Sequence, residues 1–143
     1  MKSTKEKFLN QLQEIYKLET MPTLTSFLYG EEALLLKLYL KEATNPKDLA
    51  QILGVTKGRI TAIIGSLRKK AYLDIEQNKL DKRKKDLVFT TKGLHYIETR
   101  LWIVDTYFDK LLTHLGEDTS KELIDVLDKL LTKLKTFEVK HHG

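Results

Sequence analysis

The order of elements between residues 46 and 93 limits the possible folds of this chain more than any other feature. The segment begins with a short helix pattern. Pro46 suits the first turn of a helix, where its missing N–H is not needed, and Asn45 can cap that helix through its side-chain oxygen. The apolar face of this helix consists of Leu49, Ile52 and Leu53. We expect Gly54 to end it, because glycine tolerates the left-handed conformation of a tight helix stop.

A second helix is predicted from residue 56 to about residue 70, with Thr56 as its cap. Its inward stripe consists of Ile60, Ile63, Ile64 and Leu67. Its outward face is polar and basic and consists of Lys57, Arg59, Thr61, Ala62, Gly65, Ser66, Arg68 and Lys69. Two helices joined by a short turn that contains glycine, the second basic outside, match the helix-turn-helix that reads DNA. A helical hairpin with a solvated charged face is the alternative.

The residues that follow predict a β-hairpin with a basic tip. Short β-prone runs around Leu73 and Val88 predict its two strands. Between them lies NKLDKRKKD, which has five basic residues from Lys79 to Lys85. Alone, such a run is more often a solvated loop. After a basic-faced helix it is better explained as a wing, whose side chains can reach phosphates or enter a minor groove.

The positive charge of the chain is concentrated in this part. Residues 46–93 hold twelve Lys or Arg and five Asp or Glu, whereas the remaining residues hold 13 and 15. The formal net charge of +5 therefore arises from one third of the chain. A local basic field on a compact helix-turn-helix pattern is typical of a protein that binds duplex DNA.

The same residues resemble the winged helix-turn-helix of the MarR family (multiple antibiotic resistance regulators). The family has Asp-x-Arg at the wing tip, and this chain has Asp81, Lys82 and Arg83 there. The family then has Leu-Thr-x-x-Gly at the start of a long helix, and residues 89–93 read Phe-Thr-Thr-Lys-Gly. Further matches around the first two helices are Asp48, Leu49, Ala50, Leu53, Val55 and Thr56. Sar-type winged regulators, which are similar in style, stay open as an alternative.

The resemblance is specific over residues 20–115, with two departures from the family pattern. Ala71 stands where the family usually has Gly after the second helix. Ala62 and Gly65 stand where larger polar side chains are common, so fewer long side chains can reach base edges. The resemblance implies a mainly α fold with a small β-wing. Its winged helix-turn-helix lobe (33–93) is flanked by dimerisation helices (1–20 and 94–140), and by length the chain is a single domain, 1–143.

The residues predicted to contact DNA come from the second helix and the wing. They are Lys57, Arg59, Thr61, Ser66, Arg68, Lys69, Lys79, Asp81, Lys82, Arg83, Lys84 and Lys85. We expect Arg59 or Thr61 to approach base edges, and Lys57 and Arg68 to approach phosphates.

Apolar stripes at helical spacing lie on both sides of the winged region. They can belong to an internal core or to a dimer seam. We favour a seam, because terminal helices of a chain this small have little else to pack on. A two-fold dimer would present two recognition helices roughly 34–36 Å apart, which matches a pseudo-palindromic operator. The predicted dimerisation residues are Phe8, Leu12, Ile15, Leu123, Leu127, Leu130, Leu134 and Phe137.

Catalysis, metal binding and membrane insertion find little support. The sequence has no nucleophile-elbow, P-loop or Rossmann glycine motif. Glu31 and Glu32 are adjacent, so on a helix they point about 100° apart, and we interpret them as a solvated face. The pairs His95/Glu98 and His114/Asp118 lack further ligands, so we expect no metal and no cofactor. The chain has no cysteine, no apolar run of about 18–20 residues and no signal-peptide pattern, and we expect a cytoplasmic protein.

We therefore predict a non-enzymatic, sequence-specific transcription regulator, which we expect to be a homodimeric repressor. Two alternatives stay open: a sequence-tolerant nucleoid or architectural DNA-binding protein, which Ala62 and Gly65 favour, and a protein–protein adaptor, which the basic charge disfavours. Effectors of MarR-family regulators commonly bind between the dimer helices and the winged lobe, so the resemblance implies a small-molecule partner. Its aromatic candidates are Tyr16, Phe27, Tyr39, Trp102, Tyr107 and Phe108.

Overall fold

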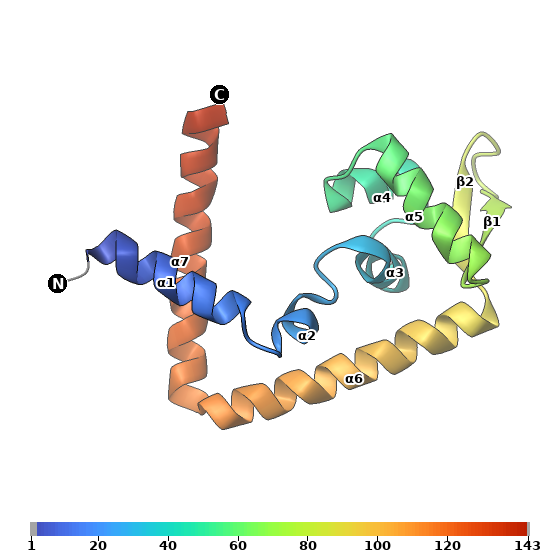
Figure 1. The fold of residues 1–143 in the computed structure, drawn as a ribbon. Helices are drawn as coiled ribbons and strands as arrows, with labels where there is room; N and C mark the ends of the chain where they lie inside the picture. Colours follow the sequence, from blue (N-terminus) through green and yellow to red (C-terminus); the bar gives the residue numbers. More distant parts are fainter. Residues whose placement is uncertain (1–2, 143) are drawn as a thin grey trace. The chain divides into compact units, whose positions relative to one another are not determined.

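The computed structural model describes residues 3–142, which are mostly helical and include one small sheet (Figure 1). The elements follow in the order α1 (Thr4–Tyr16), α2 (Met21–Thr25), α3 (Gly30–Tyr39), α4 (Pro46–Leu53), α5 (Lys57–Lys69), β1 (Leu73–Gln77), β2 (Lys85–Phe89), α6 (Thr91–Leu115) and α7 (Glu117–His142). The prediction of a mainly α fold with a small β-wing is confirmed. The chain divides into two compact units, one up to Arg100 and one from Leu101 onward.

The caps of α4 and α5 form as the sequence predicts. The Oδ1 of Asn45 accepts a hydrogen bond from the N–H of Asp48 (2.9 Å), and Pro46, the next residue, is the first of α4. Gly54 ends α4 with a φ of 65°, in the left-handed region. The Oγ1 of Thr56 then accepts from the N–H of Arg59 (3.1 Å), which starts α5. Each cap satisfies backbone groups that a helix end leaves without partners.

The core of the first unit lies between α3, α4, α5, the sheet and the start of α6. Its buried apolar residues are Ala33, Leu34, Leu35, Leu38, Ala43, Leu49, Ile60, Ile63, Ile64, Leu67, Leu73, Leu87 and Ile97. The predicted inward stripe of α5 is therefore confirmed. On α4 the prediction is wrong in part, because Ile52 is 44% exposed. This short helix faces the core with its Leu49 and Leu53 row, and Ile52 lies beside that row.

The two strands form an antiparallel pair, with Leu73 opposite Phe89 and Ile75 opposite Leu87. Leu73 and Leu87 are buried on the inner face of this hairpin. The free edge of β2 is partly covered, because the N–H of Leu87 donates to the carbonyl oxygen of Thr44 (2.8 Å). The segment before α4 thus anchors the base of the wing to the helical core.

The start of α6 is held by Thr90, which belongs to the Thr-x-x-Gly motif. Its Oγ1 accepts a hydrogen bond from the N–H of Gly93 (2.9 Å) and donates to the carbonyl oxygen of Ala71 (2.5 Å). Its N–H donates to the carbonyl oxygen of Tyr72 (3.1 Å). Ala71 has a φ of 61°, in the left-handed region that favours glycine.

The second unit consists of the rest of α6 and α7, which meet at Gly116 (φ 86°). Val104 is buried, whereas every described side chain of α7 except that of Ser120 is exposed. The first turns of α6 belong to the first unit, where Ile97 is fully buried. The boundary between the units therefore lies inside the 94–140 range assigned from sequence to dimerisation. That assignment and the single domain stay predictions.

Candidate nucleic-acid interface

The outer face of α5 exposes most of the side chains that the sequence assigns to DNA. Lys57, Arg59, Thr61, Arg68 and Lys69 are all exposed, while the apolar stripe on the other side of the helix is buried. The Oγ1 of Thr61 donates back to the carbonyl oxygen of Lys57 (2.9 Å), a bond that uses the hydroxyl hydrogen and leaves both lone pairs able to accept. The helix therefore presents a polar and basic face to solvent on a rigid apolar base.

Ser66 differs from the prediction, because it does not face freely outward. It is half-buried, and its Oγ donates to Oε1 of Glu31 on α3. The Nζ of Lys70 donates to the other oxygen of Glu31 at 2.6 Å. Burial alone would raise the pKa of the Glu31 carboxyl, but the bonds from Lys70 and Ser66 outweigh it, so this pKa lies below its usual value. Glu31 thus ties α5 to α3.

Glu32 makes a second such link, to α6. Its carboxylate accepts from Nε of Arg100 (2.9 Å) and from Nη2 of the same residue (3.3 Å). The hydroxyl of Tyr96 donates to Oε1 of Glu32 (3.1 Å), and the Tyr96 ring stacks on Tyr72 with centroids 4.6 Å apart. The interpretation of Glu31 and Glu32 as a solvated face is therefore wrong. The two adjacent carboxylates point apart, as expected, and each joins α3 to a different helix.

The tip of the wing is an ordered turn built around Asn78. The Oδ1 of Asn78 accepts from the N–H of Leu80 and of Asp81, both at 2.8 Å. Its Nδ2 donates to Oδ2 of Asp86 (2.8 Å), whose Oδ1 accepts from the hydroxyl of Thr44 (3.0 Å). Sequence reasoning did not single out Asn78, although asparagine commonly bonds to the backbone two residues on in turns. These bonds connect the tip to the base of the wing.

Asp81 and Arg83 form an ion pair at the tip. The Nε of Arg83 lies 3.1 Å from Oδ1 of Asp81, and its Nη2 lies 3.3 Å from Oδ2. The side-chain and backbone hydrogen bonds from Arg83 hold the pKa of the Asp81 carboxyl below its usual range. The Arg83 side chain is still 91% exposed. Asp81 therefore orients an arginine that remains open to solvent.

The other basic residues of the wing are exposed. Lys79, Lys82 and Lys84 lie in the tip, whereas Lys85 begins β2 opposite Gln77. Among the residues that the structure describes, none of these four lysines is placed in an ion pair. The wing and α5, which both belong to the first compact unit of the chain, therefore carry positive charge that no ion pair of the described residues neutralises.

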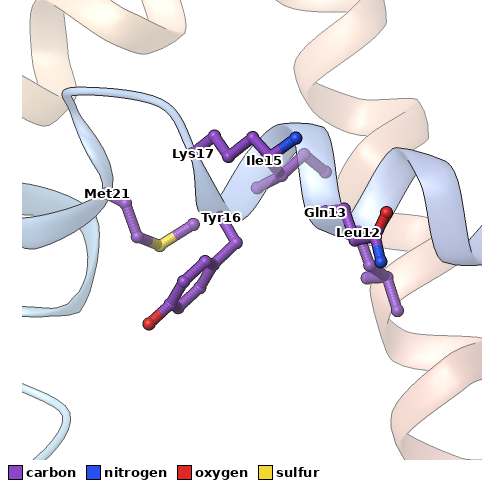
Figure 2. Close-up of a pocket in the computed structure, with 6 residues that line it drawn as sticks. All are labelled: Leu12, Gln13, Ile15, Tyr16, Lys17 and Met21. Atoms are coloured by element: carbon purple, nitrogen blue, oxygen red, sulfur yellow. The ribbon is translucent and has the colours of Figure 1, made fainter.

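The predicted dimerisation residues are exposed in both units. On α7 the exposed fractions run from 40% at Leu130 to 56% at Phe137. On α1, Phe8, Leu12 and Ile15 are each about half exposed, and no residue of that helix is buried. Figure 2 shows a shallow apolar depression at the end of α1 and the start of α2, lined by Leu12, Gln13, Ile15, Tyr16, Lys17 and Met21.

Two further kinds of site are not found in the described part of the chain. Residues 3–142 bring together no group of three or more His, Cys, Asp or Glu that could hold a metal ion. None of the helices in that range is both long enough and apolar enough to cross a membrane.

No model of a known protein family matches the sequence. The HTH-type transcriptional regulator PapX of Escherichia coli is 29% identical to it over 87 residues, which are 61% of this chain and 52% of PapX. The chain therefore spans about half the length of that relative.

Solved structures match over nearly the whole chain. Staphylococcus aureus MepR in a complex with DNA has a TM-score of 0.65 at 21% identity, over 93% of this chain and 99% of MepR. A MarR protein from Peptoclostridium difficile has a TM-score of 0.64 at 20% identity, over 98% of this chain and 93% of its own. MepR bound to ethidium bromide has a TM-score of 0.58 at 21% identity, over 92% and 97% of the two chains. At these identities the likeness establishes a shared fold.

Proposed function

We propose that this chain, which has the winged helix-turn-helix fold of the MarR family, is a DNA-binding transcription regulator. In the proposed complex α5 enters the major groove of duplex DNA, and the wing contacts the neighbouring backbone or minor groove. Arg59 or Thr61 approaches base edges, and Lys57 and Arg68 approach phosphates. A DNA ligand would put its place of action in the cytoplasm of a bacterium.

The observation that carries this proposal is the distribution of charge around α5 and the wing. Two acidic groups of this region are already engaged, Glu31 by Lys70 and Ser66, and Asp81 by Arg83. The lysines of the wing and the outer side chains of α5 stay exposed. A polyanion would therefore meet cations without having to displace competing carboxylates from most of them. The structural likeness to MepR in complex with DNA supports the same ligand.

Selection of bound fragments from genomic DNA tests the proposal. We expect a recurring pseudo-palindrome that binds about 10³-fold or more tightly than unrelated duplex at the same salt concentration. Purified protein that shows no affinity for any duplex at low salt would contradict the proposal.

We further propose that the regulator is a homodimer that acts as a repressor. The apolar side chains that form a row on α7, and those that form a row on α1, are about half exposed, and contiguous exposed apolar surface on a soluble protein commonly marks an interaction site. Burying them between two copies would place two α5 helices on successive half-sites of the DNA. A repressor needs no contact with polymerase, so occupation of the operator alone accounts for regulation.

Release by a small molecule is the remaining part of the proposal. MepR binds ethidium bromide in one of the structures that share this fold. The lining of the apolar depression beside Tyr16 (Figure 2) includes Leu12 and Ile15, which are assigned here to the dimer seam. A planar apolar ligand at that place would compete with dimer packing. Titration of the protein–DNA complex with planar ligands of this kind tests whether they release the DNA. Fluorescence anisotropy of labelled DNA measures the release.

One observation favours a second candidate, a sequence-tolerant nucleoid or architectural protein. Gly58, Ala62 and Gly65 occupy much of the exposed face of α5, and no other atom lies within 4 Å of a Cβ placed on either glycine. A surface of small residues permits close approach to DNA but gives few base contacts. Equal affinity for selected and unrelated duplexes at fixed salt would favour this candidate over the regulator.

A further inference from the structure

Leu80 is the most exposed large apolar side chain of the residues described, at 99% of its accessible area. It lies in the tip of the wing, between the end of β1 and the start of β2. A single exposed leucine is ordinary on a protein surface. Leu80 is unusual because the backbone that carries it is fixed and because four exposed basic side chains share the tip with it.

The backbone at Leu80 is held by the turn around Asn78. The N–H of Leu80 itself donates to Oδ1 of Asn78 (2.8 Å), and so does the N–H of Asp81 (2.8 Å). The N–H of Asn78 donates to the carbonyl oxygen of Lys84 (2.9 Å), which closes the tip. These bonds fix the backbone at the tip, and the Leu80 side chain that it carries lies in water.

The surroundings of Leu80 indicate what it meets. Lys79, Lys82, Arg83 and Lys84 share the tip and are all exposed. A group of exposed cations beside an exposed leucine suits a polyanion that has an apolar surface close to its charges. The minor groove of DNA has this character, because its walls are the C–H surfaces of deoxyribose and its rims are phosphates. Leucine is among the side chains that DNA-bending proteins insert there.

We propose that Leu80 is an apolar DNA contact, which the wing presents to the deoxyribose walls of a minor groove while its basic neighbours hold the phosphates. This inference rests on the proposed DNA-binding function and adds a contact that carries no charge. Such a contact has a distinct signature. Loss of a lysine weakens binding and also reduces the dependence of affinity on salt, because fewer counterions are released. Loss of Leu80 weakens binding and leaves that dependence unchanged.

The first test compares Leu80→Ala with two matched variants, using a duplex of about three helical turns. We expect Leu80→Ala to weaken binding about five- to tenfold at every salt concentration, with the slope of log affinity against log salt unchanged. Leu80→Met, which keeps the apolar volume, should stay within about twofold of the wild type. Leu28→Ala removes another leucine, 70% exposed but outside the wing, and should bind as the wild type does. Because Leu80 is exposed, its replacement removes no packing from the fold.

The second test uses the absence of cysteine from the chain. An environment-sensitive dye on Leu80→Cys reports whether this position loses contact with water. We expect a blue shift with duplex DNA, and none with heparin, which has the charge but no groove. The same dye on Leu28→Cys should not respond to either.

The outcomes separate the inference from the proposed function. If the wild type binds duplex and Leu80→Ala binds equally well, the inference is wrong and the regulator proposal stands. A change in salt slope for Leu80→Ala would also overturn the inference. A blue shift with vesicles of anionic phospholipid but not with duplex would make Leu80 a membrane contact instead. If the wild type binds no duplex, the proposed function fails first.

Discussion

A Cβ atom added to Gly93 would lie 1.9 Å from the carbonyl oxygen of Tyr72. The first turn of α6 therefore rests directly on the backbone that joins α5 to β1. The same carbonyl accepts the N–H of Thr90, and the Tyr72 ring stacks on Tyr96 one turn further along α6. The glycine of the Thr-x-x-Gly motif is required by this close approach, since its φ is not in the left-handed region.

Gly93→Ala should lower the free energy of unfolding by about 3 kcal/mol, because α6 or the Tyr72 backbone must move to make room for the methyl group. Urea unfolding followed by circular dichroism measures the change. Gly65→Ala is the matched control: its Cβ meets no atom within 4 Å, and alanine in an exposed helix should raise stability by about 1 kcal/mol. Similar effects of the two substitutions would contradict the close approach.

Glu31→Gln should loosen α5 from α3 and reduce the free energy of unfolding at neutral pH by about 1 kcal/mol. The pKa of Glu31 is lower in the folded protein than its usual value, so its contribution is present above that usual value. The contribution is lost as the pH falls through the lowered pKa. The wild type and the variant should therefore converge in acid.

Thermal unfolding of both proteins between neutral and acidic pH measures this convergence. Glu98→Gln, on the exposed side of α6, serves as the control and should show no such dependence. A difference between Glu31→Gln and the wild type that persists unchanged at the lowest pH would show that charge is not involved.

Arg83→Ala should weaken DNA binding by about tenfold or more and leave the fold intact, because the side chain is exposed. The effect of Asp81→Asn should depend on Arg83. In a protein that keeps Arg83, Asp81→Asn should disturb the orientation of the arginine and lower the affinity for DNA. In the Arg83→Ala background it only removes a negative charge near DNA, and affinity should rise or stay the same. A double-mutant cycle measures the coupling, and simple additivity would mean that Asp81 does not position Arg83.

Arg59→Ala should change sequence preference as well as affinity, because a good bidentate base contact discriminates by about 1–3 kcal/mol. Lys57→Ala should weaken binding evenly across sequences and reduce the salt slope by about one unit. Binding to a set of operator variants with each base pair replaced in turn compares the two. If preference is unaltered at every position in the Arg59 variant, Arg59 is a phosphate contact.

Replacement of Leu127 and Leu134 by Asp should break the proposed dimer and weaken operator binding together, because each half-site alone offers too few contacts. Sedimentation at low micromolar concentration measures the assembly. Replacement of Lys129 and Lys133 by Asp introduces the same residues on another side of α7 and should leave the dimer intact. A wild-type monomer that binds a full operator tightly would mean that the two-fold arrangement is wrong.

The sequence by itself determined the local structure of the winged lobe. The caps at Asn45 and Thr56, the stop at Gly54 and the buried stripe of α5 all depend on residues within about one helical turn of each other. The hairpin could be predicted for the same reason, since its two strands and its basic tip follow one another directly in the sequence. Short-range interactions of this kind do not need knowledge of the rest of the fold.

Only the tertiary structure decided the roles of Glu31, Glu32 and Ser66. Glu31 meets Ser66 and Lys70 at sequence separations of 35 and 39, and Glu32 meets Tyr96 and Arg100 at 64 and 68. Which side chains meet across such distances depends on how the helices pack. A glutamate on a helix has the same sequence pattern whether its carboxylate is solvated or bonded to another helix. Only its burial against a particular partner in the folded protein distinguishes the two cases.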